Sequence, residues 1–135
     1  QWHTAFDFDY WLRAFQAFPL RIGYIPHLQG KTRLHNDTIT ARQRDKVALE
    51  ATQLLARHFG AADATRLHNY CVELQLGIAE SPKGVNLANH IYQLFESARP
   101  YLHPAAFDQL QRTWLTGDPP NSPQNERCSW QSETL

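Results

Sequence analysis

At 135 residues, with 42% hydrophobic and 19% charged side chains, the chain has the size and composition of one globular domain. No apolar run approaches the roughly 18 residues that a membrane span requires, so we expect no membrane partner. The 13 basic and 13 acidic side chains give a formal charge of zero, which excludes a uniformly basic or acidic protein. The two cysteines, Cys71 and Cys128, lie far apart in the sequence, which favours a reducing compartment and predicts a cytoplasmic protein.

The first predicted element is an amphipathic helix that begins after Thr4 and ends at Pro19. Thr4 is a candidate N-cap, and Asp7 stands three positions later, where a capping box places its acidic partner. The helical spacing of apolar side chains predicts a buried face made of Phe8, Trp11, Leu12, Phe15 and Phe18. A helix this rich in aromatic surface is also a candidate docking element, with Phe8, Trp11 and Phe15 as its contact residues.

An irregular segment and a second helix follow. The helical period is lost from Pro19 to Thr38, and about twenty residues without regular structure are unusual in a compact domain, which favours a functional role. Thr38 or Thr40 is the expected cap of the second helix, and Gly60 suits the position just after its end. The predicted apolar stripe of this helix consists of Val47, Ala51, Leu54, Leu55 and Phe59.

Three further helices are predicted before a polar tail. Asp63 caps the third, with Leu67, Tyr70, Cys71, Leu74 and Ile78 on one face. Ser81 and Pro82 open the fourth, whose stripe is Val85, Ala88, Ile91, Tyr92 and Phe95, and Pro100 ends it at Arg99. Pro104 opens the fifth, with Phe107, Leu110 and Trp114 in the core and Gly117 as its stop.

These elements predict an all-α fold, a bundle of four to five antiparallel helices with an irregular segment after the first helix. We expect connections of about three to five residues between the last four helices, which makes sequential neighbours antiparallel. Residues 1–117 then form a single helical-bundle domain. Residues 118–135, rich in Pro, Asn, Ser and Gln, are expected to form a mobile polar tail.

The basic side chains are concentrated in one stretch of the sequence. From Arg21 to Lys46 there are six basic residues and two acidic ones, a net charge of +4; the basic residues are Arg21, Lys31, Arg33, Arg42, Arg44 and Lys46. Several cations on one surface favour contact with nucleic-acid backbone, and the rings of Tyr24, His27 and His35 could stack on unpaired bases. This hypothesis requires that the cations share one surface.

In bundle size, and in the basic residues Lys31, Arg33, Arg42, Arg44 and Lys46, the chain resembles the small helical subunits of RNA-guided CRISPR effector complexes. The resemblance is one of proportions and covers no diagnostic motif. It implies a non-enzymatic accessory or assembly subunit that braces nucleic acid and docks on other protein subunits without a cofactor. A protein-interaction module with an acidic partner is the related alternative.

An enzymatic alternative is a helical ribonuclease of the HEPN type, in which an Arg and a His lie a few residues apart near a helix end. The candidate pairs are Arg21 with His27, Arg66 with His68, and Arg99 with His103. No Glu-x-x-His or His-x-x-x-His spacing is present, so no metal site is predicted. The position of Cys71 in an apolar stripe predicts an inert core thiol rather than a nucleophile.

Overall fold

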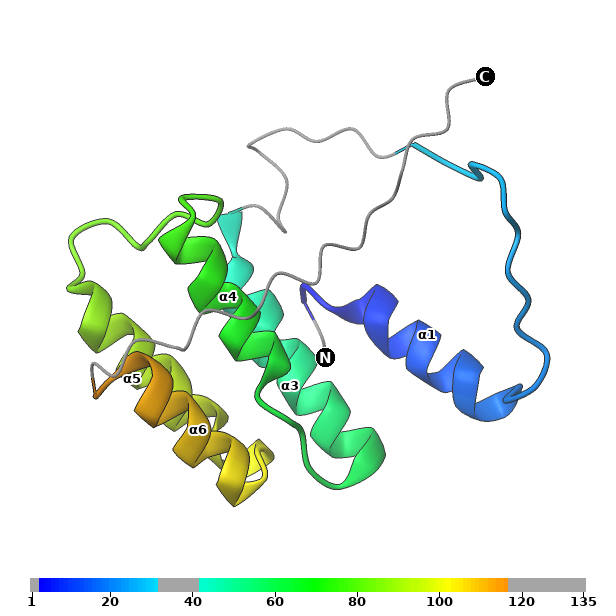
Figure 1. Ribbon diagram of the computed structural model, residues 1–135. Helices are drawn as coiled ribbons and strands as arrows, with labels where there is room; N and C mark the ends of the chain where they lie inside the picture. The colour runs from blue at the N-terminus through cyan, green and yellow to red at the C-terminus, as the bar shows by residue number, and fades with distance from the viewer. Residues whose placement is uncertain (1–2, 32–41, 117–135) are drawn as a thin grey trace.

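A computed structural model describes residues 3–31 and 42–116. Within these two ranges the chain forms an all-helical bundle without a strand. The helices are α1 (Phe6–Ala17), α3 (Arg44–Phe59), α4 (Thr65–Gln75), α5 (Leu87–Ala98) and α6 (Pro104–Trp114), and a short 3-10 turn η1 (Arg99–Tyr101) joins α5 to α6. In Figure 1, α3 lies between α1 on one side and α4, α5 and α6 on the other. The predicted all-α bundle is confirmed.

The main core lies among α3, α4, α5 and α6, and its most deeply buried side chains include Phe95, Leu67, Leu110 and Cys71. The helical periodicity of α4, α5 and α6 explains this core, because each helix turns one apolar stripe inward. The connection after α3 is tied to the one before α6, since the Ala62 N–H donates to the Tyr101 carbonyl and the His103 N–H donates to the Ala62 carbonyl.

The starts of α1 and α5 differ from the sequence predictions. Thr4 does not cap α1; the N-cap position is Ala5, and the Thr4 hydroxyl donates to Glu50 instead. Ser81 and Pro82 do not open α5, because Gly84 takes a φ of 76°, outside the helical region, and Asn86 caps the helix through the Asn89 N–H. Since α5 begins at Leu87, the connection from α4 is longer than the three to five residues expected.

The ends of α3 and α4 also correct the predictions. α3 begins at Arg44 after Gln43, so it does not extend back to the expected caps Thr38 and Thr40, which lie outside the described residues. Phe59 and Ile78, both predicted as core, are more than half exposed, Phe59 at the last residue of α3 and Ile78 beyond the end of α4. Gly60 ends α3 with a φ of 91°, as its predicted position requires.

The predicted stripe of the fourth helix holds only in part, since Ile91 and Phe95 are buried whereas Val85, Ala88 and Tyr92 are exposed. Asp63 is not the N-cap of α4, which is Ala64, although the Asp63 carboxylate accepts the Thr65 N–H at 2.9 Å just before the helix. Pro104 is the first residue of α6, as predicted. The expected stop at Gly117, the polar tail 118–135 with Cys128, and Arg33 and His35 lie outside the described residues. The prediction of a single domain over residues 1–117 stays a prediction.

Candidate interaction surface of the N-terminal arm

Two polar clamps hold α1 against α3. In the first, the Glu50 carboxylate of α3 accepts the backbone N–H groups of His3, Thr4 and Ala5 at 2.8–3.2 Å, and the Thr4 hydroxyl at 2.8 Å. Burial raises the pKa of Glu50, but these hydrogen bonds outweigh burial and leave the pKa below its ordinary value. The backbone that leads into α1 is therefore bound by a carboxylate from another helix. The N-terminus of a helix is a favourable place for such a negative charge.

The second clamp is centred on His58 of α3, whose side chain is only 12% exposed. Its Nε2 lies 3.0 Å from Asp9 Oδ1, and its Nδ1 lies 3.0 Å from Gln16 Oε1. Hydrogen bonding to His58 lowers the pKa of Asp9, burial opposes this, and the nearby Arg13 guanidinium, 3.2 Å from Asp9, lowers it further. This clamp fixes which face of α1 is turned toward α3.

The apolar contact of α1 with the bundle is small. It consists of buried Ala5, Leu12 and Leu54, with Phe8 and Leu55 packed beside them. The Arg66 guanidinium of α4 lies 4.7 Å above the Phe8 ring, so Phe8 belongs to this contact and is not a free docking residue.

Much of the predicted core stripe of α1 is instead exposed and aromatic, which corrects that prediction. Trp11 is 56% exposed, Phe15 46% and Phe18 54%, although all three were expected to be buried. Only Leu12 of that stripe is buried, because the two clamps orient α1 through residues on its polar side. Trp11 and Phe15 therefore lie where a docking residue must lie.

Residues 18–31, which follow α1, continue this exposed surface. They form no helix and are exposed throughout, and Figure 1 shows the segment running away from the bundle. Leu20 is 96% exposed and Tyr24 86%. We call residues 6–31, that is α1 and this segment, the N-terminal arm. The sequence analysis did not predict that the apolar side chains of this segment form an exposed surface. The loss of the helical period was the available signal, because a segment without an apolar stripe cannot pack as a helix of the bundle.

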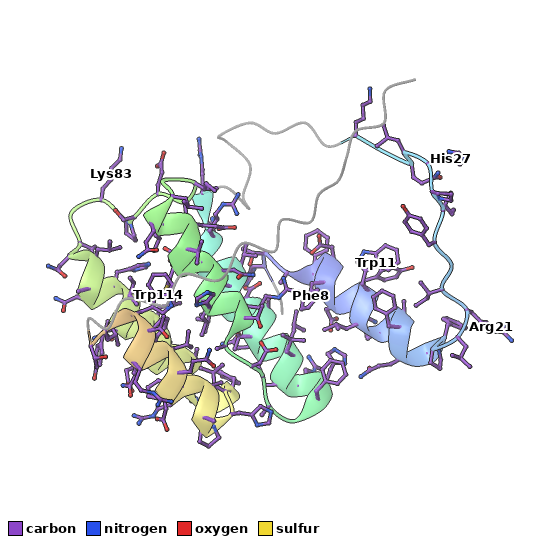
Figure 2. All side chains as sticks on the ribbon, viewed as in Figure 1. Phe8, Trp11, Arg21, His27, Lys83 and Trp114 are labelled. Carbon is purple, nitrogen blue, oxygen red and sulfur yellow. The ribbon has the colours of Figure 1, made fainter. Side chains whose placement is uncertain are left out.

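The structure does not bring the predicted cations that it describes, all but Arg33, onto one surface. Arg21 and His27 lie on the arm, across the molecule from Lys83 (Figure 2), and Lys31 is exposed on the same segment as Arg21. Lys46 is exposed on α3, whereas Arg42 precedes that helix rather than sharing its face. Arg44 is half-buried and pairs with Glu73 of α4 at 2.9 Å.

A smaller cationic group lies at the start of α3. Arg42, Arg44 and Lys46 line a hollow of about 330 Å³ together with Lys83 from the α4–α5 connection. Asp45 and Glu80 line the same hollow. Lys83 was not among the predicted site residues, because it stands alone in the sequence and only the fold brings it to this group.

The residues of the enzymatic alternative are placed as follows. Arg21 and His27 lie exposed on the non-helical part of the arm. His68 accepts a hydrogen bond from the Trp114 indole at 3.2 Å, and Arg99 pairs with Glu96 and lies over the Phe107 ring. Cys71 is 1% exposed, and burial raises the pKa of its thiol to about 12, as expected of a core cysteine.

Within the described residues, no group of three or more His, Cys, Asp or Glu side chains is arranged to hold a metal ion. None of the helices in this part of the chain is both long enough and apolar enough to span a membrane. No protein-family model, curated protein or solved structure matches the chain.

Proposed function

We propose that the chain is a non-enzymatic assembly module that docks on another protein through its N-terminal arm. The observation that supports this is the large apolar surface of the arm. Ten large apolar side chains in residues 6–28 are about half exposed or more: Phe6, Tyr10, Trp11, Phe15, Phe18, Leu20, Ile22, Tyr24, Ile25 and Leu28.

The size of this surface suits a protein interface. A large apolar side chain presents roughly 150–250 Å² when fully exposed, so ten half-exposed ones present on the order of 1,000 Å². The largest apolar patch on a typical monomer is about 300–600 Å². A stable interface buries about 800 Å² on each partner, an area that the arm can supply.

The charge of the arm points to an acidic partner. The arm has three basic residues, Arg13, Arg21 and Lys31, and two acidic ones, Asp7 and Asp9, which both lie in the first turn of α1. Arg13 is paired with Asp9, which leaves Arg21 and Lys31 as exposed cations among apolar side chains. A second copy of the chain would bring two arms of like charge together, so a different protein with an apolar, acidic groove fits better.

Site-specific photo-cross-linking tests the proposal. A photoreactive amino acid replaces Trp11 or Tyr24 in the full chain, and Tyr92, which is 45% exposed on α5, is the matched control position. In extracts of the source cells we expect both arm positions to give one adduct of the same mass, resistant to nuclease, that Tyr92 does not give. The partner identified by mass spectrometry, once purified, must bind the wild-type chain and bind R21E/K31E more weakly.

Three outcomes contradict the proposal. One is the absence of a discrete adduct at the arm positions. The second is an adduct of twice the chain's mass, which indicates self-association. The third is an adduct lost on nuclease treatment, which indicates that nucleic acid bridges the two proteins.

The second candidate function is contact with nucleic-acid backbone, and the hollow lined by Arg42, Arg44, Lys46 and Lys83 favours it. Its four cations and two carboxylates, Asp45 and Glu80, give a net charge of +2. We expect binding to a short single-stranded RNA to weaken steeply between about 50 and about 200 mM salt. K46E/K83E must abolish this binding and R21E/K31E must not; failure to bind at low salt removes this candidate.

A further inference from the structure

The backbone of the segment after α1 is unpaired. A turn follows the helix, in which the Arg21 N–H donates to the Phe18 carbonyl at 3.2 Å. Beyond this turn, the backbone of residues 22–25 forms no hydrogen bond with any residue that the structure describes. The chain does not bend again until His27, and Figure 1 shows this stretch as an extended path that leads away from the bundle. Its consecutive N–H and C=O groups are therefore available to a partner.

The residues of this stretch are typical of a β-strand. Residues 21–25 read Arg-Ile-Gly-Tyr-Ile, and isoleucine and tyrosine are enriched in strands. In an extended chain alternate side chains lie on opposite faces, so Ile22 and Tyr24 share one face. Both side chains are more than half exposed. The stretch thus offers two neighbouring apolar side chains on one face and the charge of Arg21 on the other.

Two prolines set the length of the stretch. Pro19 and Pro26 have no N–H, so a hydrogen-bonded ladder cannot continue through either of them. The five residues 21–25, at about 3.3 Å each, span about 17 Å, which is an ordinary length for a strand. Because Pro19 and the turn at Phe18 separate the stretch from α1, residues 21–25 can pair while α1 stays on the bundle.

The described part of the chain contains no strand, so it offers no sheet to this stretch. We infer that residues 21–25 bind the partner of the N-terminal arm as an added β-strand, paired with an open edge of a β-sheet in that protein. The inference rests on the proposed docking of the arm and specifies how the contact is made. The backbone ladder supplies affinity and pockets for Ile22 and Tyr24 supply specificity, as in other extended segments that join sheet edges. An acidic residue beside the edge complements Arg21.

The composition of the stretch disfavours pairing between two copies of the chain. A ribbon of only two strands is marginally stable in water. Gly23, in the middle of the stretch, weakens such a ribbon further because it has no side chain to pack across the pair. A partner with a preformed sheet supplies the additional strands that a second copy lacks.

Replacement of single backbone amides by esters tests the inference in the full chain. An ester made with an α-hydroxy acid at position 22, 23, 24 or 25 keeps the side chain and removes the N–H donor. The binding partner is the protein that is cross-linked at Trp11, a position on α1 outside the stretch, and then purified.

The expected result is an alternating pattern of affinities. In an edge strand every second residue turns its N–H toward the neighbouring strand, and the residues between turn theirs away. We expect the esters at one pair of alternate positions, 22 and 24 or 23 and 25, each to raise the Kd about three- to tenfold and the other pair to change it less than about twofold. An ester at position 28 is the matched control. Leu28 is exposed on the same arm beyond Pro26, so this ester must leave the Kd unchanged.

Two results overturn the inference. One is an equal rise in Kd for all four esters, which indicates that the stretch folds into a helix on binding and uses the N–H groups for its own hydrogen bonds. The other is an unchanged Kd for all four, which indicates contact through side chains alone. In both cases the adduct at Trp11 and the binding of the purified partner stand, so the docking of the arm is retained. If no protein is captured at Trp11, the docking itself fails and the inference fails with it.

Discussion

Replacing Glu50 by Gln removes the charge from the clamp that holds the start of α1. Glu50 Oε2 accepts the Thr4 N–H and the Thr4 hydroxyl at 2.8 Å and the Ala5 N–H at 3.0 Å, and the His3 N–H lies 3.2 Å from both carboxylate oxygens. Gln keeps one acceptor oxygen but turns an NH₂ group toward donors. A hydrogen bond to a charged group contributes about 1.5–3 kcal/mol, so the docking of α1 loses about 2 kcal/mol. This corresponds to roughly a 30-fold change in the opening equilibrium of α1.

Amide hydrogen exchange read by mass spectrometry measures this opening. Peptides covering residues 6–17 should exchange roughly 30-fold faster in Glu50→Gln, whereas peptides from α4 and α5 should not change, because α1 contributes little to the main core. Glu96→Gln is the control, since it removes a carboxylate that pairs with exposed Arg99 on α5. Unchanged exchange in α1 would refute the role of the clamp. Equal acceleration in α1 and α4 would refute the idea that α1 opens separately.

Three further predictions concern acid, helix capping and the core. The pKa values of Asp9 and Glu50 in the folded chain lie below their ordinary values of 3.8 and 4.5, so both carboxylates stabilise docked α1 above that range. This stabilisation is lost as the pH falls below the ordinary values and through the lowered ones, so in an acid titration the ¹⁵N NMR shifts of α1 amides should move toward disordered values before those of α5. Asn86→Ala should lower the free energy of unfolding by about 1 kcal/mol and Ser81→Ala by less than about 0.5 kcal/mol in urea melts, since Asn86 is the observed cap; equal effects would contradict that assignment. Phe95→Ala should cost about 3–5 kcal/mol in the same assay because the ring is fully buried, and a cost below about 1 kcal/mol would contradict the described core.

Local sequence rules predicted the helices of the main core well. α6 has its predicted stripe inside the bundle, as does α4 except for Ile78, and Pro104 begins α6 as expected. In α6 the period of apolar residues and the start signal of Pro104 agree with each other. The start of α5 was predicted wrongly, because Ser81-Pro82 is a good local start signal but the positive φ of Gly84 breaks the helical path three residues later. The sequence alone did not distinguish this start from the one at Asn86.

The orientation of α1 could not be predicted from its own residues. Its periodicity is compatible with burying Trp11 and Phe15, and this is what we expected. Glu50 and His58, which lie more than forty residues further along the chain, orient α1 through hydrogen bonds so that Phe8 and Leu12 contact the bundle and Trp11 and Phe15 do not. The same limit applies to the cations, because a run of basic residues in the sequence does not determine the path of the irregular segment on which Arg21 and Lys31 lie.

The Glu50 clamp also determines how a partner can use α1. α1 has no side-chain cap of its own at Ala5, and the acceptor for the three N–H groups leading into it comes from α3. A protein that separated α1 from the bundle would leave these N–H donors without an acceptor and would have to supply a carboxylate of its own. In the proposed docking, a partner that binds Trp11 and Phe15 while α1 stays on the bundle avoids that loss. The bundle then presents α1 as a helix that is already folded, instead of releasing it as a flexible peptide.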